Sequence, residues 1–205
     1  MMIYDVSMLI HDKMQVYKNK EDKRPIFKNA LNHIDNQVHE TNLYINLHTG
    51  THVDYPLHMI DKGDTSDSES LLELIGSCKV LDLTELDSKI TINDLKKYPI
   101  EEDDFLFFKT KNSLSEEFLH DFVYLDKEAA QYLKDKKIRG VGTDGLGIER
   151  SQPNHETHKI LLSNGIIIIE GLRLKDIIEK EYEMICLPLK IKSVEASLAR
   201  VILMD

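Results

Sequence analysis

The sequence predicts an α/β fold of the mixed α+β kind, in which a mixed β-sheet is flanked by helices. Three observations support this prediction. Short apolar runs of strand length recur along the chain, helical patterns lie between them, and no internal repeat, low-complexity tract or Pro/Gly-rich linker interrupts the order. We therefore expect residues 1–205 to form a single compact domain, a size that allows a sizeable hydrophobic core.

Eight apolar runs have the length and composition of strands, because β-branched and aromatic residues favour a pleated surface. The predicted strands are Ile3–Val6, Leu43–Leu47, Lys79–Leu83, Phe105–Lys109, Ile138–Val141, Ile166–Ile169, Met184–Leu187 and Ala199–Met204.

Four segments between these runs predict helices. Asp126 stands where an N-cap is expected, before Lys127-Glu128-Ala129-Ala130, and Asn164-Gly165 is a helix stop signal. The predicted helices are Thr91–Lys97, Asp126–Lys134, Asn154–Ser163 and Leu174–Glu181. The polar stretch 61–69 predicts a solvated loop, because its carboxylates do not have the spacing of an EF-hand calcium loop.

Charge and cysteine content exclude several classes of protein. The 26 Lys and Arg against 36 Asp and Glu give a net charge of −10, which argues against nucleic-acid binding. Cys78 and Cys186 are far apart and form no CxxC pair, so a disulfide scaffold and a thiolate zinc finger are not expected. Any metal site must therefore use His and carboxylate ligands.

No segment predicts contact with a membrane. The N-terminus lacks the basic start and apolar core of a signal peptide. The longest aliphatic run, Ile166–Ile169, is far shorter than the roughly 18–20 residues that span a bilayer. We therefore expect a cytoplasmic protein.

The informative segment is 43–58, which contains three of the nine histidines. Its odd positions are apolar or β-branched, from Leu43 to Leu57, and its even positions from 46 onward include every metal-capable group: His48, His52, Asp54 and His58. An extended chain would place these groups on one face and a packing surface on the other.

A straight strand cannot bring His48 and His52 to one ion, because residues i and i+4 of a strand lie roughly 13 Å apart. The chain must fold back between them, and Gly50 allows the backbone angles of such a bend. The simpler alternative is a half-buried strand whose His and Asp side chains face solvent. The metal site is favoured, because imidazole and carboxylate suit zinc or manganese, and three protein ligands leave a position for water.

The segment His48-Thr-Gly-Thr-His52-Val-Asp54-Tyr-Pro56-Leu-His58 resembles the HxGTHxDxPxH signature of the metal-dependent "putative cyclase" family, which includes bacterial kynurenine formamidases and isatin hydrolases. Two further blocks extend the resemblance. The stretch from His158 to Leu172 is similar to HxxLLxxGIxIIEGL, and Cys186-Leu-Pro188-Leu-Lys190 followed by Arg200 is similar to the family's closing strand pair.

The resemblance implies specific roles and a swivelling β/β/α-like fold. His48, His52 and Asp54 would bind one divalent metal, and Asp54 would bridge to a second metal held by His158 and Glu170. His58 would be the general acid/base. The metals would be Zn²⁺ or Mn²⁺, two per subunit, and the protein would be a homodimer or higher homo-oligomer.

Two of these residues can also be interpreted from the sequence itself. Glu170 follows four Ile residues, so it ends a strand that should be buried, where a carboxylate is costly unless it is paired or bound to metal. The alternative is a strand end exposed to water. His155 and His158 are three residues apart, which is not the zincin HExxH spacing, and His155 is interpreted as structural.

The resemblance has departures at named positions. Formamidases of the family carry a Trp in an N-terminal substrate loop, where this chain has Tyr17, which is therefore the substrate-binding candidate. In the same loop Lys18-Asn19 replaces a Pro-Gly turn. The segment 140–145 matches GxGxxG literally, but no helix is expected after it, so a dinucleotide site is rejected. It resembles instead the family's GxD loop, with Asp144 as a supporting carboxylate.

The function predicted from these features is metal-dependent hydrolysis of a carbon–nitrogen amide bond in a small molecule. The substrate would be an aryl formamide such as N-formylkynurenine, or a related cyclic amide, and His58 would move the proton. The alternative is a non-catalytic metal-binding homologue that has lost its substrate loop. A scaffold without metal is the third hypothesis.

Overall fold

The computed structural model describes residues 1–68 and 70–205; Glu69, the end of the predicted polar loop, lies outside the described residues. The strands are β1 (Ile3–Asp5), β2 (Ile26–Leu31), β3 (Glu40–Tyr44), β4 (His52–Asp54), β5 (Ile75–Asp82), β6 (Lys89–Ile90), β7 (Phe105–Lys109), β8 (Tyr124–Leu125), β9 (Gly140–Thr143), β10 (Ile167–Glu170), β11 (Glu181–Pro188) and β12 (Ala196–Met204). The α-helices are α1 (His33–Asn36), α2 (Ile92–Leu95), α3 (Lys127–Lys136) and α4 (Glu156–Leu162).

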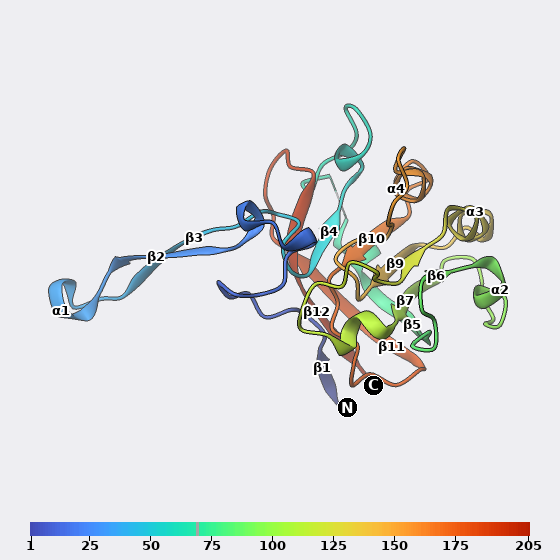
Figure 1. The fold of residues 1–205 in the computed structure, drawn as a ribbon, viewed down its shortest axis with the longest axis horizontal. Helices are drawn as coiled ribbons and strands as arrows, with labels where there is room; N and C mark the ends of the chain where they lie inside the picture. The colour runs from blue at the N-terminus through green and yellow to red at the C-terminus, as the bar shows by residue number, and fades with distance from the viewer. Residues whose placement is uncertain (69) are drawn as a thin grey trace.

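Eight of the strands form one mixed sheet in the order β1-β12-β11-β5-β7-β9-β10-β4. Three pairings in this sheet are parallel, namely β5 with β7, β7 with β9 and β9 with β10. The other pairings are antiparallel. Because β12 also pairs with β4, the sheet closes on itself like a barrel. Helices α2, α3 and α4 lie together on one side of it (Figure 1). The predicted mixed α/β fold is confirmed.

The central strands are buried on both faces, which explains their continuous apolar sequence. Phe105 and Phe107 of β7 pack in the core enclosed by the closed sheet, whereas Leu106 and Phe108 pack under the helices. Ile168 of β10 likewise faces the helices, while its neighbours in β10 face the enclosed core. Because side chains alternate along β10, Glu170 is the next residue that points to the helix side. It lies at the edge of the helix-covered layer.

Three of the predicted helices are present: α2 and α4 are shorter than expected, and α3 continues two residues beyond its expected end, to Lys136. The Asp126 side chain accepts from Glu128 N at the start of α3, as the N-cap prediction required. Thr91 caps α2 through a reciprocal pair with Asp94. The helix α4 begins after His155, whose backbone has a left-handed conformation with φ +53°.

Two predictions of secondary structure were wrong. The segment 174–181, all of it described, is not helical: it makes one turn, from Ile177 N to Leu174 O, and Glu181 begins β11. Both apolar residues of that turn are buried in the enclosed core, so packing overrides helix propensity. The strand expected over Leu43–Leu47 ends at Tyr44, because Asn46 starts a turn in which its side chain accepts from His48 N.

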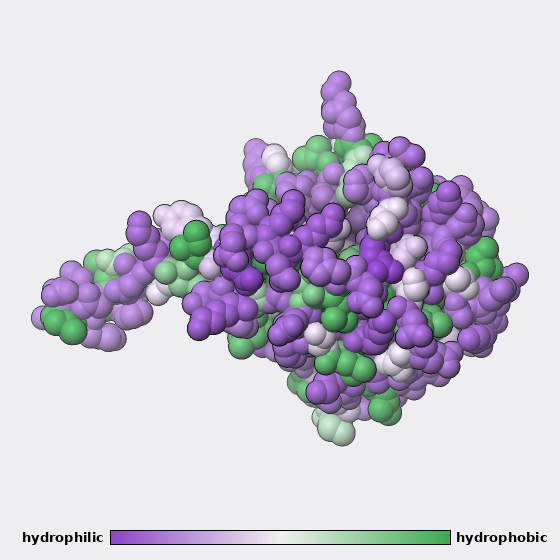
Figure 2. Space-filling model, in the orientation of Figure 1, coloured by the Kyte–Doolittle hydropathy of each residue, from purple (hydrophilic) through white to green (hydrophobic). Residues whose placement is uncertain are grey.

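The strands β2 and β3 form a hairpin arm that projects from the body and carries α1 at its tip (Figure 1). The strand β2 was not predicted from the sequence. Apolar side chains lie exposed along this arm (Figure 2). They include Ile26, Phe27, Ile34, Val38, Leu43 and Tyr44. Leu43 therefore does not belong to the packing surface expected from the alternation.

The glycines of the GxGxxG match serve close packing. A Cβ atom at Gly140 would lie 2.4 Å from the ring of Phe105, and one at Gly142 would lie 2.6 Å from the ring of Phe107. The chain continues after Gly145 without a helix through the described residues up to 155. This explains the glycines without a phosphate site. In the described part of the chain, no helix is long and apolar enough to cross a membrane.

Candidate metal centre

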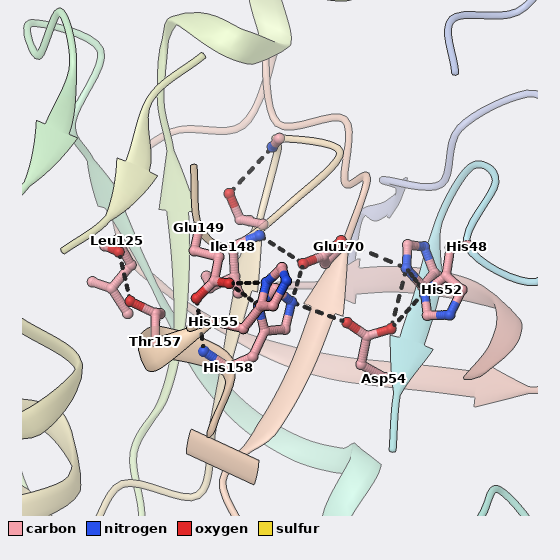
Figure 3. Close-up of polar contacts among 12 residues, drawn as sticks. His48, His52, Asp54, Leu125, Ile148, Glu149, His155, Thr157, His158 and Glu170 are labelled. Atoms are coloured by element: carbon pink, nitrogen blue, oxygen red, sulfur yellow. Dashed lines mark hydrogen bonds and ion pairs between the residues drawn. The ribbon is translucent and has the colours of Figure 1, made fainter. Parts of the chain in front are cut away.

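The five predicted metal ligands come from four parts of the fold: the turn before β4, β4 itself, β10 and α4. In the antiparallel pairing of β10 with β4, Glu170 lies opposite His52 and Ile168 lies opposite Asp54. Because side chains alternate along a strand, His52 and Asp54 share one face, and Val53 between them packs in the enclosed core. His158 reaches the same point from α4 (Figure 3).

His48 reaches the site through the bend that the sequence predicted. The turn at Asn46 is followed by Gly50, whose φ of +79° is a left-handed conformation. The bend brings His48 Nδ1 to 3.3 Å from His52 Nε2. His52 Nδ1 donates to the carbonyl of Gly50 at 2.9 Å, which leaves Nε2 directed at the centre.

Asp54 lies between two groups of imidazoles. Its Oδ1 atom is 3.0 Å from His48 Nδ1 and 3.4 Å from His52 Nε2, and its Oδ2 atom is 3.6 Å from His158 Nε2. Among the described residues, neither oxygen accepts a hydrogen bond of good geometry, although the side chain is fully buried. A buried carboxylate in this condition is costly unless a cation binds it.

Glu170 completes the cluster and is 4% exposed, so the alternative of a strand end in water does not hold. Its Oε1 atom accepts from Ile148 N at 2.6 Å and lies 3.4 Å from His158 Nε2. Its Oε2 atom lies 3.6 Å from His52 Nε2. Glu170 therefore faces one imidazole with each oxygen, whereas Asp54 faces two with Oδ1 and one with Oδ2.

Glu149, which was not predicted from the sequence, contacts the backbone nitrogen and the Nδ1 atom of His158. Its Oε2 atom accepts from His158 N at 3.1 Å, and its Oε1 atom lies 3.2 Å from His158 Nδ1 and 2.6 Å from His155 Nδ1. A carboxylate at Nδ1 directs Nε2 toward the centre. Glu149 lies in a loop, where no periodicity marks a buried residue. Glu195, whose Oε1 atom is 3.5 Å from His48 Nε2, was also missed.

The electrostatics of the cluster favour positive charge at its centre. Burial raises the pKa of Asp54, but the imidazoles of His158, His48 and His52 outweigh burial and hold that pKa well below its usual range. Burial lowers the pKa of His158, but Asp54, Glu149 and Glu170 outweigh burial and raise that pKa well above 6.5. The low pKa of Asp54 keeps it in the carboxylate form that binds a cation, and the raised pKa of His158 shows that the carboxylates around its ring favour positive charge there.

His58 ends the short 3₁₀ turn Pro56–His58 and lies beside the cluster. Its ring centroid is 4.1 Å from that of His48 and 5.6 Å from that of His158. Burial and the neighbouring His48 and His158 lower its pKa to about 4, although Asp54 opposes the shift. The imidazole is therefore neutral near pH 7.

A cavity of about 460 Å³ opens onto the cluster. His48, His58, His158 and Glu170 line one part of it. Tyr17 lines another part, and its ring lies edge-on to Phe118 at 5.5 Å and to Phe122 at 6.5 Å between centroids. The structure thus brings all seven predicted site residues to one cavity or to the cluster beneath it.

A buried set of imidazoles and carboxylates that meets a ligand-sized cavity is the arrangement of a metal-dependent hydrolase. The sequence matches the "Putative cyclase" family over residues 4–150. It is also 33% identical to the "Kynurenine formamidase" of Erythrobacter litoralis over 160 residues, which cover 77% of this chain and 73% of that protein. The chain belongs to the putative cyclase family of enzymes.

Solved structures share the whole fold. A "predicted metal-dependent hydrolase from Bacillus stearothermophilus" is 48% identical with a TM-score of 0.91, covering 98% of this chain and 97% of that one. Isatin hydrolase A from Labrenzia aggregata has a TM-score of 0.87 at 22% identity, covering 98% of this chain and 93% of that one. At that identity the likeness concerns the fold.

Proposed function

We propose that this enzyme hydrolyses a carbon–nitrogen amide bond in a small molecule, such as an aryl formamide like N-formylkynurenine or a related cyclic amide. The observation that carries the proposal is the position of Asp54, whose side chain is fully buried and whose two oxygens face different imidazoles. The similarity to a kynurenine formamidase supports the amide class of substrate.

The donor atoms divide into two sets that share Asp54. His48 and His52 lie next to Oδ1, and His158 lies next to Oδ2. Glu170 contacts both sets, with Oε1 3.4 Å from His158 Nε2 and Oε2 3.6 Å from His52 Nε2, and we group it with His158. We assign each set to one divalent ion, Zn²⁺ or Mn²⁺, because both ions accept imidazole and carboxylate ligands. The poorly bonded oxygens of Asp54 and the charge-favouring pKa shifts fit such ions.

Bound divalent ions supply Lewis-acid chemistry, since they acidify water and polarise a carbonyl oxygen. In the proposed reaction water adds to the amide carbonyl carbon and the carbon–nitrogen bond breaks. His58 takes the proton that the water loses and gives it to the leaving nitrogen, so the products are a carboxylic acid and an amine. Its place on the cavity wall, beside His48, supports this role.

The alternative of a metal-binding homologue without catalysis depends on a lost substrate loop. Tyr17 lines the cavity and packs against Phe118 and Phe122, which supports retention of an aromatic wall for a flat substrate. This favours the enzyme over the non-catalytic homologue.

We also propose that residues 1–205 act as one domain in a cytoplasmic homodimer or higher homo-oligomer. The hairpin arm supports the oligomer, because a two-stranded sheet with exposed apolar side chains buries too little surface to be stable by itself. Light scattering should give a multiple of the chain mass.

The test of the function uses metal-loaded protein, a panel of aryl formamides, cyclic amides and small esters, and the substitution His58→Ala. We expect hydrolysis of at least one amide, with a kcat about 10²–10⁴-fold lower in His58→Ala at unchanged metal content. The control His120→Ala alters an exposed histidine and should keep full activity. A fully loaded protein that turns over none of the panel would overturn the proposal.

A further inference from the structure

A basic rim, defined as Tyr17, Lys18 and Lys23, lines the same cavity as the metal-centre residues His48 and His58. It belongs to the segment in which this chain departs from the family's Pro-Gly turn. The two ammonium groups lie beside the ring of Tyr17, with Lys18 Nζ 5.2 Å and Lys23 Nζ 5.5 Å from the ring centroid.

Hydrogen bonds hold the rim against the metal-binding turn. Thr49 Oγ1, next to His48, donates to the carbonyl of Lys23 at 2.8 Å. The following residue, Arg24, donates from Nη1 to the carbonyl of Met14 at 2.8 Å, and Met14 is buried. The position of Lys23 relative to His48 is therefore set by the fold.

The charge of the rim is available to a ligand. Within the described residues, neither Lys18 nor Lys23 has a carboxylate oxygen within 4.0 Å of its ammonium. Two divalent ions would bring four positive charges, which balance the four carboxylates that contact the histidines of the centre, Asp54, Glu149, Glu170 and Glu195. The two lysines then make the loaded cavity positive, so it attracts anions.

We propose that Lys18 and Lys23 bind a carboxylate of the substrate, so that the enzyme selects amides that carry a negative charge away from the bond that breaks. The inference rests on the proposed function and names its substrate class. The substrate's ring would lie near Tyr17, and its carboxylate would meet the ammonium groups beside that ring.

The experiment compares ortho-, meta- and para-formamidobenzoate with the corresponding formamidobenzamides, which have the same shape without the charge. The variants are Lys18→Gln, Lys23→Gln, the double variant and Lys23→Arg. Lys20→Gln is the matched control, because Lys20 is exposed in the same segment and does not line the cavity. All proteins are loaded with metal before the assay.

For the best benzoate we expect the double variant to raise KM about tenfold or more, with kcat within about twofold. The KM of the matching benzamide should change less than about twofold, and Lys23→Arg and Lys20→Gln should resemble the native protein. Raising the salt concentration should raise KM for the benzoate in the native protein and much less in the double variant.

Calorimetric binding of benzoate and benzamide to the metal-loaded protein gives a readout without turnover. We expect the native protein to prefer benzoate and the double variant to lose that preference. Equal KM values for both substrate classes, or a double variant that weakens both equally, would overturn the inference while leaving amide hydrolysis intact. If no formamide is hydrolysed, the proposed function fails, and the calorimetric preference alone decides the inference.

Discussion

Glu170 lies directly opposite His52 in the antiparallel pairing of β10 with β4, and its Oε2 atom is 3.6 Å from His52 Nε2. The same register places Ile168 opposite Asp54. A slip of one residue would turn Glu170 toward the enclosed apolar core and separate it from His52. The pairing of these strands therefore determines both the fold and the proposed metal centre.

Removal of metal should destabilise the protein. An ion that binds only the folded state at about 100 times its Kd adds about 2.7 kcal/mol to the free energy of unfolding. We expect chelation to lower Tm by about 5–10 °C. Metal analysis by mass spectrometry should find a stoichiometry near two ions per chain.

Asp54→Asn should remove this dependence, because a neutral amide cannot serve both donor sets. Its Tm should be the same with and without chelator. Asp61→Asn, at an exposed position, should keep the native response. An unchanged chelator response in Asp54→Asn would contradict the assignment of Asp54 to the metals.

Glu149→Gln should weaken metal binding about 10–100-fold with little loss of fold, because a neutral amide cannot match the carboxylate contacts to His158 N and His158 Nδ1. Competition with a chromogenic chelator measures the affinity, and circular dichroism checks the fold. Glu128→Gln, an exposed position in the first turn of α3, is the control. Native affinity in Glu149→Gln would show that Glu149 does not position His158.

Gly171→Ala should disturb the turn that carries His48. Gly171 has φ +71°, and a Cβ atom there would lie 2.5 Å from the carbonyl oxygen of Gly50. We expect a loss of about 2 kcal/mol or more in the free energy of unfolding, together with weaker metal binding. Denaturant unfolding and metal analysis measure the two effects.

Gly165→Ala is the control for Gly171→Ala, because it introduces the same backbone strain without a new contact. Gly165 has nearly the same φ, +70°, but nothing lies within 4 Å of its Cβ position. It should cost about 1 kcal/mol and leave metal binding unchanged. Equal effects of both substitutions would mean that the contact with Gly50 does not matter.

Asp144 should make stability depend on pH. Burial raises the pKa of its carboxyl to about 6, against the hydrogen bonds from Thr110 and Ser113 that oppose the shift. A folded-state pKa above the unfolded value stabilises the protein below about pH 4, and this stability is lost as pH rises through about 6.

The advantage of native protein over Asp144→Asn should therefore shrink between pH 4 and pH 7.5, by on the order of 3 kcal/mol at most. Denaturant unfolding of chelated protein measures it. Asp94→Asn is a control of opposite sign, because the hydrogen bonds of Thr91 and Lys97 outweigh burial and lower the pKa of Asp94. A difference that grows with pH at Asp144 would show that its carboxylate stays ionised.

Local patterns predicted the parts of the fold that depend on neighbours in the chain. The run Phe105–Lys109 became β7 with the expected bounds, and Asp126 capped α3. The prediction over Leu174–Glu181 was wrong, because Leu174 and Ile177 satisfy a helical pattern but are needed in the enclosed core. The strand β2 of the hairpin arm was missed, because nearly all of its residues face solvent and it shows no buried periodicity.

Some residues of the candidate site could likewise be predicted from neighbours in the chain, and others could not. The spacing from His48 to His58, with the need for a bend at Gly50, is a local property, so it could be read from the residues and from the family signature. Glu149 could not be found in this way. It stands in a loop nine positions from His158, and only the packing of α4 against that loop brings them together.

The order of residues thus determined which ligands were available and where the chain had to bend, because both follow from residue chemistry and short-range backbone geometry. Tertiary structure decided that Glu170 meets His52, that Glu149 orients His158 and that two lysines share the cavity with His58. These contacts join segments many residues apart. They exist because closing the sheet and burying its two apolar faces leave a single register in which the polar groups converge.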